Sequence, residues 1–233
     1  MKRNLLITLL LAPLAWLHGA EPMAAFTPGA RILFQGDSIT DGNCGRSADP
    51  NHILGHGYAF LIAARQGAAF PEAKLDFMNR GVSGNTVLDL EKRWPKETLE
   101  LKPDVLSILI GVNDSSHAVP LDQYEQTYDK LLADARAANP RLKLVLGEPF
   151  TLPAGQRKNG YESWLEGIRQ RQAIVARLAK KHGAALVQFQ RVFDEAAPRA
   201  PAEYWIWDGV HPTYRGHQLM ADEWERVVRG FWK

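Results

Sequence analysis

The chain has 233 residues, 45% of them hydrophobic, which is enough for one compact domain with a sizeable buried core. Its 28 basic and 26 acidic residues give a formal net charge of +2, and no run of Lys or Arg occurs. Nucleic acid and anionic lipid are therefore not expected as partners. The sole cysteine, Cys44, excludes an intramolecular disulfide.

The first 20 residues have the pattern of a secretory signal peptide. Lys2 and Arg3 precede an apolar run at 5–17, and small residues follow it. That run is too short to span a bilayer comfortably and contains Pro13. We therefore expect a secreted or periplasmic protein without stable membrane insertion. The predicted organisation is a signal peptide at 1–20, a linker at 21–29 and one domain at 30–233.

From residue 30 onward, short apolar runs alternate with longer amphipathic segments. Apolar runs typical of buried strands lie at 32–34, 75–78, 105–110, 142–146 and 185–189. Segments with the apolar spacing of helices lie at 58–69, 124–138, 164–182 and 215–232. The alternation predicts an α/β protein with a parallel sheet covered by helices on both faces. Ligands of such sheets bind beyond the carboxyl ends of the strands.

Polar turns that contain glycine follow the first three expected strands. These turns are 36–38, 79–85 and 111–114, and a fourth polar group at 208–212 follows the fifth strand by a longer loop. In a parallel sheet, the first three turns lie on the same edge. A hydroxyl, a His three residues after an Asp, and two turns with Gly and Asn are the parts that an acyl-transfer site needs.

The chemistry of these residues predicts their roles. Ser38 is the expected nucleophile, His211 the base that takes its proton, and Asp208 the carboxylate that orients the imidazole. The tetrahedral intermediate needs donors for its oxyanion. The backbone N–H groups of Ser38 and Gly84 and the side-chain amide of Asn113 could supply them. The reaction needs no cofactor, and no metal site is expected.

Several of these residues also have a structural interpretation. Ser38 could cap the helix after the strand, and Asn113 could be only a turn residue. Asp37 is expected to be structural, accepting backbone N–H bonds in its turn. Ser83 is the rival nucleophile, but a Gly-x-Ser-x-Gly elbow would need glycine where Asn85 stands. The presence of all four polar groups, at 36–38, 79–85, 111–114 and 208–212, favours the catalytic interpretation of Ser38.

These four polar groups, in this order along the chain, resemble the motifs of the SGNH hydrolase superfamily, also called GDSL esterases. The Ser, Gly, Asn and His of that name correspond here to Ser38, Gly84, Asn113 and His211, and the Asp-x-x-His pair of the family begins at Asp208. The resemblance covers the chain from about 31 to 223. It implies a flavodoxin-like, three-layer α/β/α sandwich with a central five-stranded parallel sheet.

Shorter stretches look like a narrower branch, the acetylxylan esterases and related carbohydrate acetylesterases. They include 84–86, 93–94, 110–114 and 209–213. This resemblance implies removal of O-acetyl groups from carbohydrate. Trp94, Trp205 and Trp207 lie near the motifs, where their rings could stack on sugars, and Glu148 ends the fourth expected strand. These four are the predicted substrate-binding residues, with packing against the core as the alternative for the tryptophans.

Other functions use the same motifs. A lysophospholipase, thioesterase or arylesterase would keep the catalytic set and change the acyl chain. A glycan O-acetyltransferase would pass the acyl group to a sugar hydroxyl. A non-catalytic glycan-binding module is disfavoured, because every catalytic position is present. The expected partner is an acylated small molecule or polysaccharide, and an oligomer is compatible with the sequence.

Overall fold

The computed structural model describes residues 22–47 and 49–233. Its five strands pair in the order β2-β1-β3-β4-β5, and every neighbouring pair is parallel. The strands are β1 (Arg31–Gly36), β2 (Asp76–Asn79), β3 (Val105–Leu109), β4 (Lys143–Gly147) and β5 (Ala185–Val187). This 2-1-3-4-5 order is the flavodoxin-like arrangement, so the predicted fold is confirmed.

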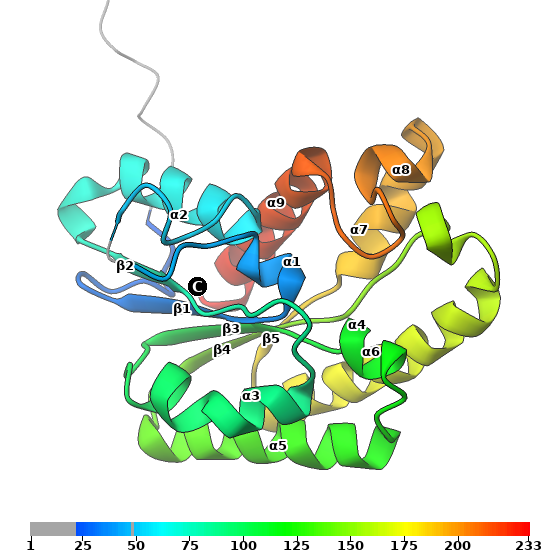
Figure 1. The fold of residues 1–233 in the computed structure, drawn as a ribbon. Coiled ribbons are helices and arrows are strands. Elements are labelled where there is room, and N and C mark those ends of the chain that lie inside the picture. Colours follow the sequence, from blue (N-terminus) through cyan, green and yellow to red (C-terminus); the bar gives the residue numbers. More distant parts are fainter. Residues whose placement is uncertain (1–21, 48) are drawn as a thin grey trace, which may run out of the picture.

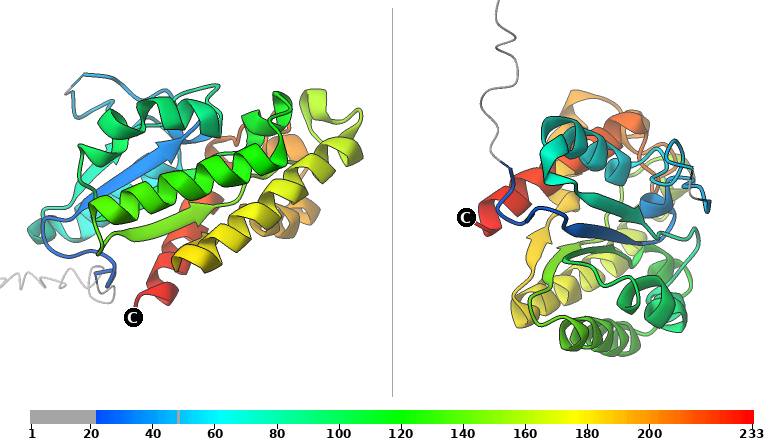
Figure 2. Two further views of the ribbon diagram at one scale, coloured as in Figure 1. Left: turned by 90° about the horizontal axis from the view of Figure 1, so that it is seen from below. Right: turned by 90° about the vertical axis from the view of Figure 1, so that its left-hand side faces the viewer.

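Helices cover both faces of the sheet (Figures 1 and 2). One layer contains α2 (Tyr58–Ala69), α7 (Phe189–Ala196) and α9 (Tyr214–Phe231). The other contains α3 (Val87–Trp94), α5 (Leu121–Ala138) and α6 (Tyr161–His182). Three short helices lie near the carboxyl ends of the strands, namely α1 (Ser38–Asp41), α4 (Val112–Ser116) and α8 (Ala202–Trp205). Single helical turns lie at η1 (Pro71–Ala73), η2 (Pro95–Leu99), η3 (Gly155–Arg157) and η4 (Ala197–Arg199).

The two helical layers bury two hydrophobic clusters, one on each face of the sheet. Side chains alternate along a strand, so Ile32 and Phe34 of β1 enter the cluster under α2 and α9, and Leu33 enters the one under α3 and α5. A strand buried on both faces favours apolar residues at nearly every position, and the polar exceptions, Gln35 and Ser107, are buried with hydrogen bonds. This preference produces the nearly continuous apolar runs seen in the sequence.

The segment before β1 belongs to the domain, so the linker predicted at 21–29 is wrong for residues 22–29. Met23 and Phe26 are buried, and the Phe26 ring lies 6.0 Å from Phe77 and 6.3 Å from Trp224. Lys143 Nζ donates to the carbonyl oxygen of Ala25 at 2.7 Å. The predicted signal peptide, 1–20, lies outside the described residues. Among the described residues, no helix is both long enough and apolar enough to cross a membrane.

Candidate active site

The predicted catalytic turns meet at the carboxyl edge of the sheet, on the right in Figure 1. β1 and β3 are neighbours, with Gly36 opposite Leu109 in register, so α1 and α4 begin side by side. An added Cβ at Gly36 would lie 2.3 Å from the Leu109 carbonyl oxygen and 2.5 Å from Thr40 Oγ1. Only glycine fits this close approach of the two strand ends.

Ser38, His211 and Asp208 form a continuous chain of hydrogen bonds. Ser38 Oγ lies 2.8 Å from His211 Nε2, and His211 Nδ1 lies 2.7 Å from Asp208 Oδ2. The N–H groups of Val210 and His211 donate to Asp208 Oδ1 at 2.9 and 2.7 Å. Burial pushes the pKa of Asp208 upward, but these hydrogen bonds outweigh it and hold the pKa below its ordinary value. The ionised carboxylate favours a proton on Nδ1, which leaves Nε2 to accept one from Ser38.

Asp37 fixes the backbone that presents Ser38. It caps α1, because the N–H of Ile39 donates to Asp37 Oδ1 at 3.0 Å. The expected structural role of Asp37 in its turn is therefore confirmed. Burial raises the pKa of this carboxyl group to about 7, and the nearby charge of Asp114 also raises it.

The loop after β2 places Gly84 and Asn113 together. Gly84 has φ +82°, a left-handed conformation that favours glycine. Asn113 Nδ2 donates to the carbonyl oxygen of Asn85 at 3.0 Å, which turns the amide towards this loop. An amide nitrogen carries two hydrogens, so one remains for a ligand. Ser83, the rival nucleophile, donates its hydroxyl to Asp41 Oδ2 at 2.8 Å, while His211 faces Ser38.

Two residues that hold this loop were not predicted as site residues. Asp41 accepts both the N–H and the hydroxyl of Ser83, which joins the end of α1 to the loop. Arg93 donates to Asn85 Oδ1 at 2.8 Å and to the carbonyl oxygen of Gly36 at 3.2 Å. A single guanidinium therefore connects the loop to the end of β1. The sequence signal for Arg93 was its place in a stretch that resembles acetylxylan esterases.

Asp114 supports the same region from α4. It is fully buried, and the N–H of Val87, the first residue of α3, donates to its Oδ1 at 3.0 Å. Burial raises the pKa of Asp114 to about 6. The carboxyl group thus connects the helix that carries Asn113 to the helix that follows the Gly84 loop.

The predicted substrate-binding residues differ in exposure. Trp94 is 2% exposed in the core under α3 and α5, so its ring offers no face to a sugar and we withdraw it from this set. Glu148 is buried and accepts the N–H of Gln190 at the start of α7, a capping role, and burial raises its pKa to about 7. Trp205 is 7% exposed, whereas Trp207 is 60% exposed. The structure leaves Trp207 as the predicted residue with an accessible ring.

A groove of about 530 Å³ lies between α2, α8 and the start of α9. We call it the aromatic groove, and its lining includes Phe60, Tyr204, Trp205, Tyr214 and Arg215. The Arg215 guanidinium lies 4.2 Å from the ring centres of both Tyr204 and Tyr214. The segments that carry these rings also flank His211, because the N–H of Trp207 donates to the His211 carbonyl oxygen at 3.1 Å. The groove therefore adjoins the loop of the predicted base.

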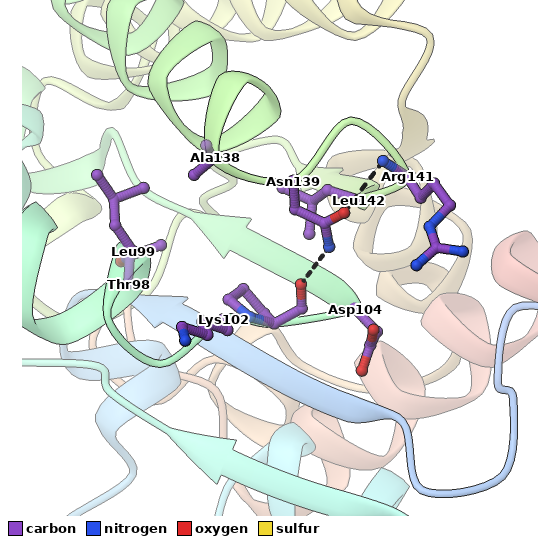
Figure 3. A pocket seen from close by; sticks show the side chains of 10 residues that line it. Thr98, Leu99, Lys102, Asp104, Ala138, Asn139, Arg141 and Leu142 are labelled. Carbon is purple, nitrogen blue, oxygen red and sulfur yellow. Dashed lines mark hydrogen bonds between the residues drawn. The ribbon is translucent and has the colours of Figure 1, made fainter.

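A separate cavity of about 420 Å³ lies at the opposite edge of the sheet, where β3 and β4 begin (Figure 3). Asn139 Nδ2 donates to the carbonyl oxygen of Pro103, and the N–H of Arg141 donates to Asn139 Oδ1. These bonds connect the two loops that line the cavity. Its position at the amino ends of the strands separates it from the predicted catalytic residues.

A flavodoxin-like sheet with hydrogen-bonded Ser, His and Asp at its carboxyl edge defines a class, an α/β enzyme with the arrangement of a serine hydrolase. The chain matches the model of the GDSL-like lipase/acylhydrolase family over residues 34–219 and belongs to that family. The protein is therefore a carboxylic ester hydrolase, and the resemblance found in the sequence is confirmed.

Similar proteins include esterases of two kinds. An acetylxylan esterase from Geobacillus stearothermophilus is 31% identical over 219 residues, covering 88% of this chain and 96% of that protein. A thioesterase 1/protease 1/lysophospholipase L1 from Escherichia coli K12 is 27% identical over 184 residues, covering 76% and 81%. The crystal structure of Axe2, an acetylxylan esterase from G. stearothermophilus, superposes with a TM-score of 0.78 at 29% identity, covering 88% and 96%.

Three further structures are catalytic mutants of Axe2. In one a serine, in another an aspartate, and in the third a histidine is replaced by alanine. The histidine follows the aspartate by three residues, which is also the spacing of Asp208 and His211 in this chain.

Proposed function

We propose that this esterase removes O-acetyl groups from carbohydrate through an acyl-enzyme on Ser38. The observation that carries the proposal is the hydrogen-bonded chain from Ser38 Oγ through His211 to Asp208, with distances of 2.8 and 2.7 Å. Ser38, activated by the base, attacks the acetyl carbonyl carbon while His211 Nε2 takes the hydroxyl proton. The spacing of the aspartate and histidine in the catalytic mutants of Axe2 supports these roles.

The oxyanion of the tetrahedral intermediate is held by three donors. They are the N–H groups of Ser38 and Gly84 and the second amide hydrogen of Asn113. When the intermediate collapses, His211 gives its proton to the sugar oxygen, and the deacetylated sugar leaves. His211 then takes a proton from water as the water oxygen attacks the acetyl-serine, and it returns that proton to Ser38 Oγ when acetate leaves. Asp208 stabilises the imidazolium in both halves of the reaction.

Two features favour a sugar as the leaving group. The acetylxylan esterase relative covers nearly the whole chain, and exposed aromatic rings flank the catalytic loop on both sides of His211. Trp207 and Tyr214 are the most exposed of these rings, and aromatic faces are suited to stacking on sugars. A signal peptide at 1–20 would take the enzyme to the secreted or periplasmic compartment, where it would meet polysaccharide.

The test is acetate release from acetylated xylan, acetylated pectin and a peracetylated sugar, each compared with p-nitrophenyl esters of increasing chain length. We expect acetyl esters to be preferred and Ser38→Ala to lose activity on all of them, with Ser83→Ala keeping most of it. Activity retained by Ser38→Ala would refute the assigned nucleophile. A strong preference for long acyl chains would refute the acetylesterase and favour the second candidate below.

The second candidate is a thioesterase or lysophospholipase. The specific observation that favours it is the apolar part of the aromatic groove, where Phe60, Leu61 and Leu219 could accept an acyl chain. The relative from E. coli carries these activities in its name. The chain-length series separates the two candidates, because an acyl site in the groove would raise kcat/KM with each added methylene pair.

A further inference from the structure

The Asp208–His211 turn rests against the segment that follows β4. Thr151 is fully buried, and its Oγ1 donates to the Gly209 carbonyl oxygen at 2.7 Å. The indole Nε1 of Trp164 in α6 donates in turn to Thr151 Oγ1 at 2.9 Å. The N–H of Leu152 also points to the Gly209 carbonyl oxygen, at 3.4 Å. One carbonyl between Asp208 and His211 is therefore held by two donors from a different part of the chain.

The backbone of the segment after β4 and the backbone of the Asp208–His211 turn are in close contact at two glycines. A Cβ on Gly209 would lie 2.5 Å from Arg157 Cβ and 2.8 Å from the Ala154 carbonyl oxygen, and this residue has φ +92°. A Cβ on Gly155, at φ +50°, would lie 2.7 Å from Asp208 Cα. Neither side of the contact has space for a side chain. The segment and the turn thus form one fitted interface.

The same segment also reaches the helix that carries Asn113. The Arg157 guanidinium lies 3.6 Å from the ring centre of Trp164 and covers the indole. Its Nη2 donates to Ser116 Oγ at 3.3 Å, at the end of α4. The contacts of this segment therefore extend from the turn of the predicted base to the helix of a predicted oxyanion donor.

We propose that Thr151 and Trp164 are positioning residues that place His211 over Ser38; this inference rests on the proposed function. The bonds from Val210 and His211 to Asp208 fix the shape of the turn. They do not fix the distance between the turn and Ser38, because Ser38 follows a different strand, β1. The Trp164–Thr151–Gly209 chain supplies that second constraint. A displacement of about 1 Å in a catalytic geometry can cost roughly 10²-fold in rate.

The test is Thr151→Val, which keeps the shape of the side chain and removes its hydroxyl. We expect kcat on p-nitrophenyl acetate to fall 10- to 100-fold, on the order of the loss for a misplaced catalytic group, with KM changed less than about twofold. Thr151→Ser should restore kcat to within about threefold, because it returns the donor. Trp164→Phe keeps a ring and removes Nε1, so it should lower kcat in the same direction. Ser163→Ala, an exposed hydroxyl beside Trp164, is the matched control and should leave both constants unchanged.

A merely structural role would give a different result. Thr151→Val and Trp164→Phe would then lower the free energy of unfolding and leave kcat per folded molecule unchanged, which would overturn the proposal. If Thr151→Val does not fold, the kcat values of Trp164→Phe and Thr151→Ser test the proposal instead. His211→Ala is measured in parallel. Full activity of His211→Ala would refute the proposed function, whereas an inactive His211→Ala beside an unimpaired Thr151→Val would refute only the positioning role.

Discussion

Replacing Asp208 by asparagine should reverse the tautomer of His211. The N–H groups of Val210 and His211 donate to Oδ1 of residue 208 at 2.9 and 2.7 Å. In the Asn variant, the amide oxygen must stay at that position, because an NH₂ group cannot accept those bonds. The NH₂ group then faces His211 Nδ1, so this nitrogen becomes the acceptor. The proton moves to Nε2, which can no longer take the proton of Ser38.

The expected loss is large for so small a change. Holding the catalytic histidine in the wrong tautomer costs about 10⁴-fold in kcat in serine hydrolases, which is about 5 kcal/mol of transition-state stabilisation. The free energy of unfolding should change by less than about 1 kcal/mol near neutral pH, because both backbone bonds to Oδ1 remain. The variant should therefore be folded, bind substrate and turn over at least about 10³ times more slowly.

The assay is steady-state hydrolysis of p-nitrophenyl acetate at pH 7, alongside urea unfolding of the same preparation. Asp134→Asn, which breaks an exposed ion pair to Lys130, is the matched control and should leave kcat unchanged. The Asn variant at position 208 should be no more active than Asp208→Ala, although it resembles the native side chain more closely. An Asn variant within tenfold of the native kcat would refute the tautomer argument.

Three other changes test further parts of the structure. Asp37→Asn should lessen the fall in stability expected of the native protein as pH rises from about 4 to about 7. Over that range the folded carboxyl, with its pKa raised to about 7, keeps a proton that the unfolded chain has lost, which is worth up to about 4 kcal/mol. Parallel stability–pH curves from urea titrations would contradict this. Gly36→Ala should cost about 1–3 kcal/mol in thermal unfolding, because its Cβ would meet the Leu109 carbonyl oxygen at 2.3 Å; an unchanged melting temperature would show that the strand ends can separate. Trp207→Ala should lower kcat/KM on acetylated xylan about tenfold and leave p-nitrophenyl acetate unaffected, since only a sugar would use its exposed ring; equal losses on both substrates would contradict a sugar-stacking role.

The sheet and the catalytic turns were predictable because they depend on local patterns. Apolar strands buried on both faces give nearly continuous apolar runs, and the turns at their carboxyl ends carry Gly, Ser and Asn. α3 was not predicted, although Val87, Leu90 and Trp94 are its buried positions. Charged residues separate these positions in a helix of only eight residues, which is too short for a clear periodicity.

The supporting residues could not be predicted because their partners come from distant parts of the chain. Asp41 contacts Ser83 because β1 and β2 are neighbours in the sheet, and Thr151 contacts Gly209 because the segments after β4 and β5 meet. Trp94 was adjacent to a motif in sequence, but the helical turn of α3 directs its ring into the core. Sequence distance from a motif therefore predicted exposure poorly for this tryptophan.

If Ser38 is the nucleophile, it carries the acyl group during turnover, so the acetyl-enzyme can be trapped and its site identified. The enzyme is mixed with p-nitrophenyl acetate, quenched in acid within the first turnovers, digested and mapped by mass spectrometry. We predict an acetyl group on the peptide at Ser38 in the native protein, and none in His211→Ala. Acetylation of Ser83 instead, or steady turnover without any acetyl-enzyme in the burst phase, would contradict the proposed mechanism.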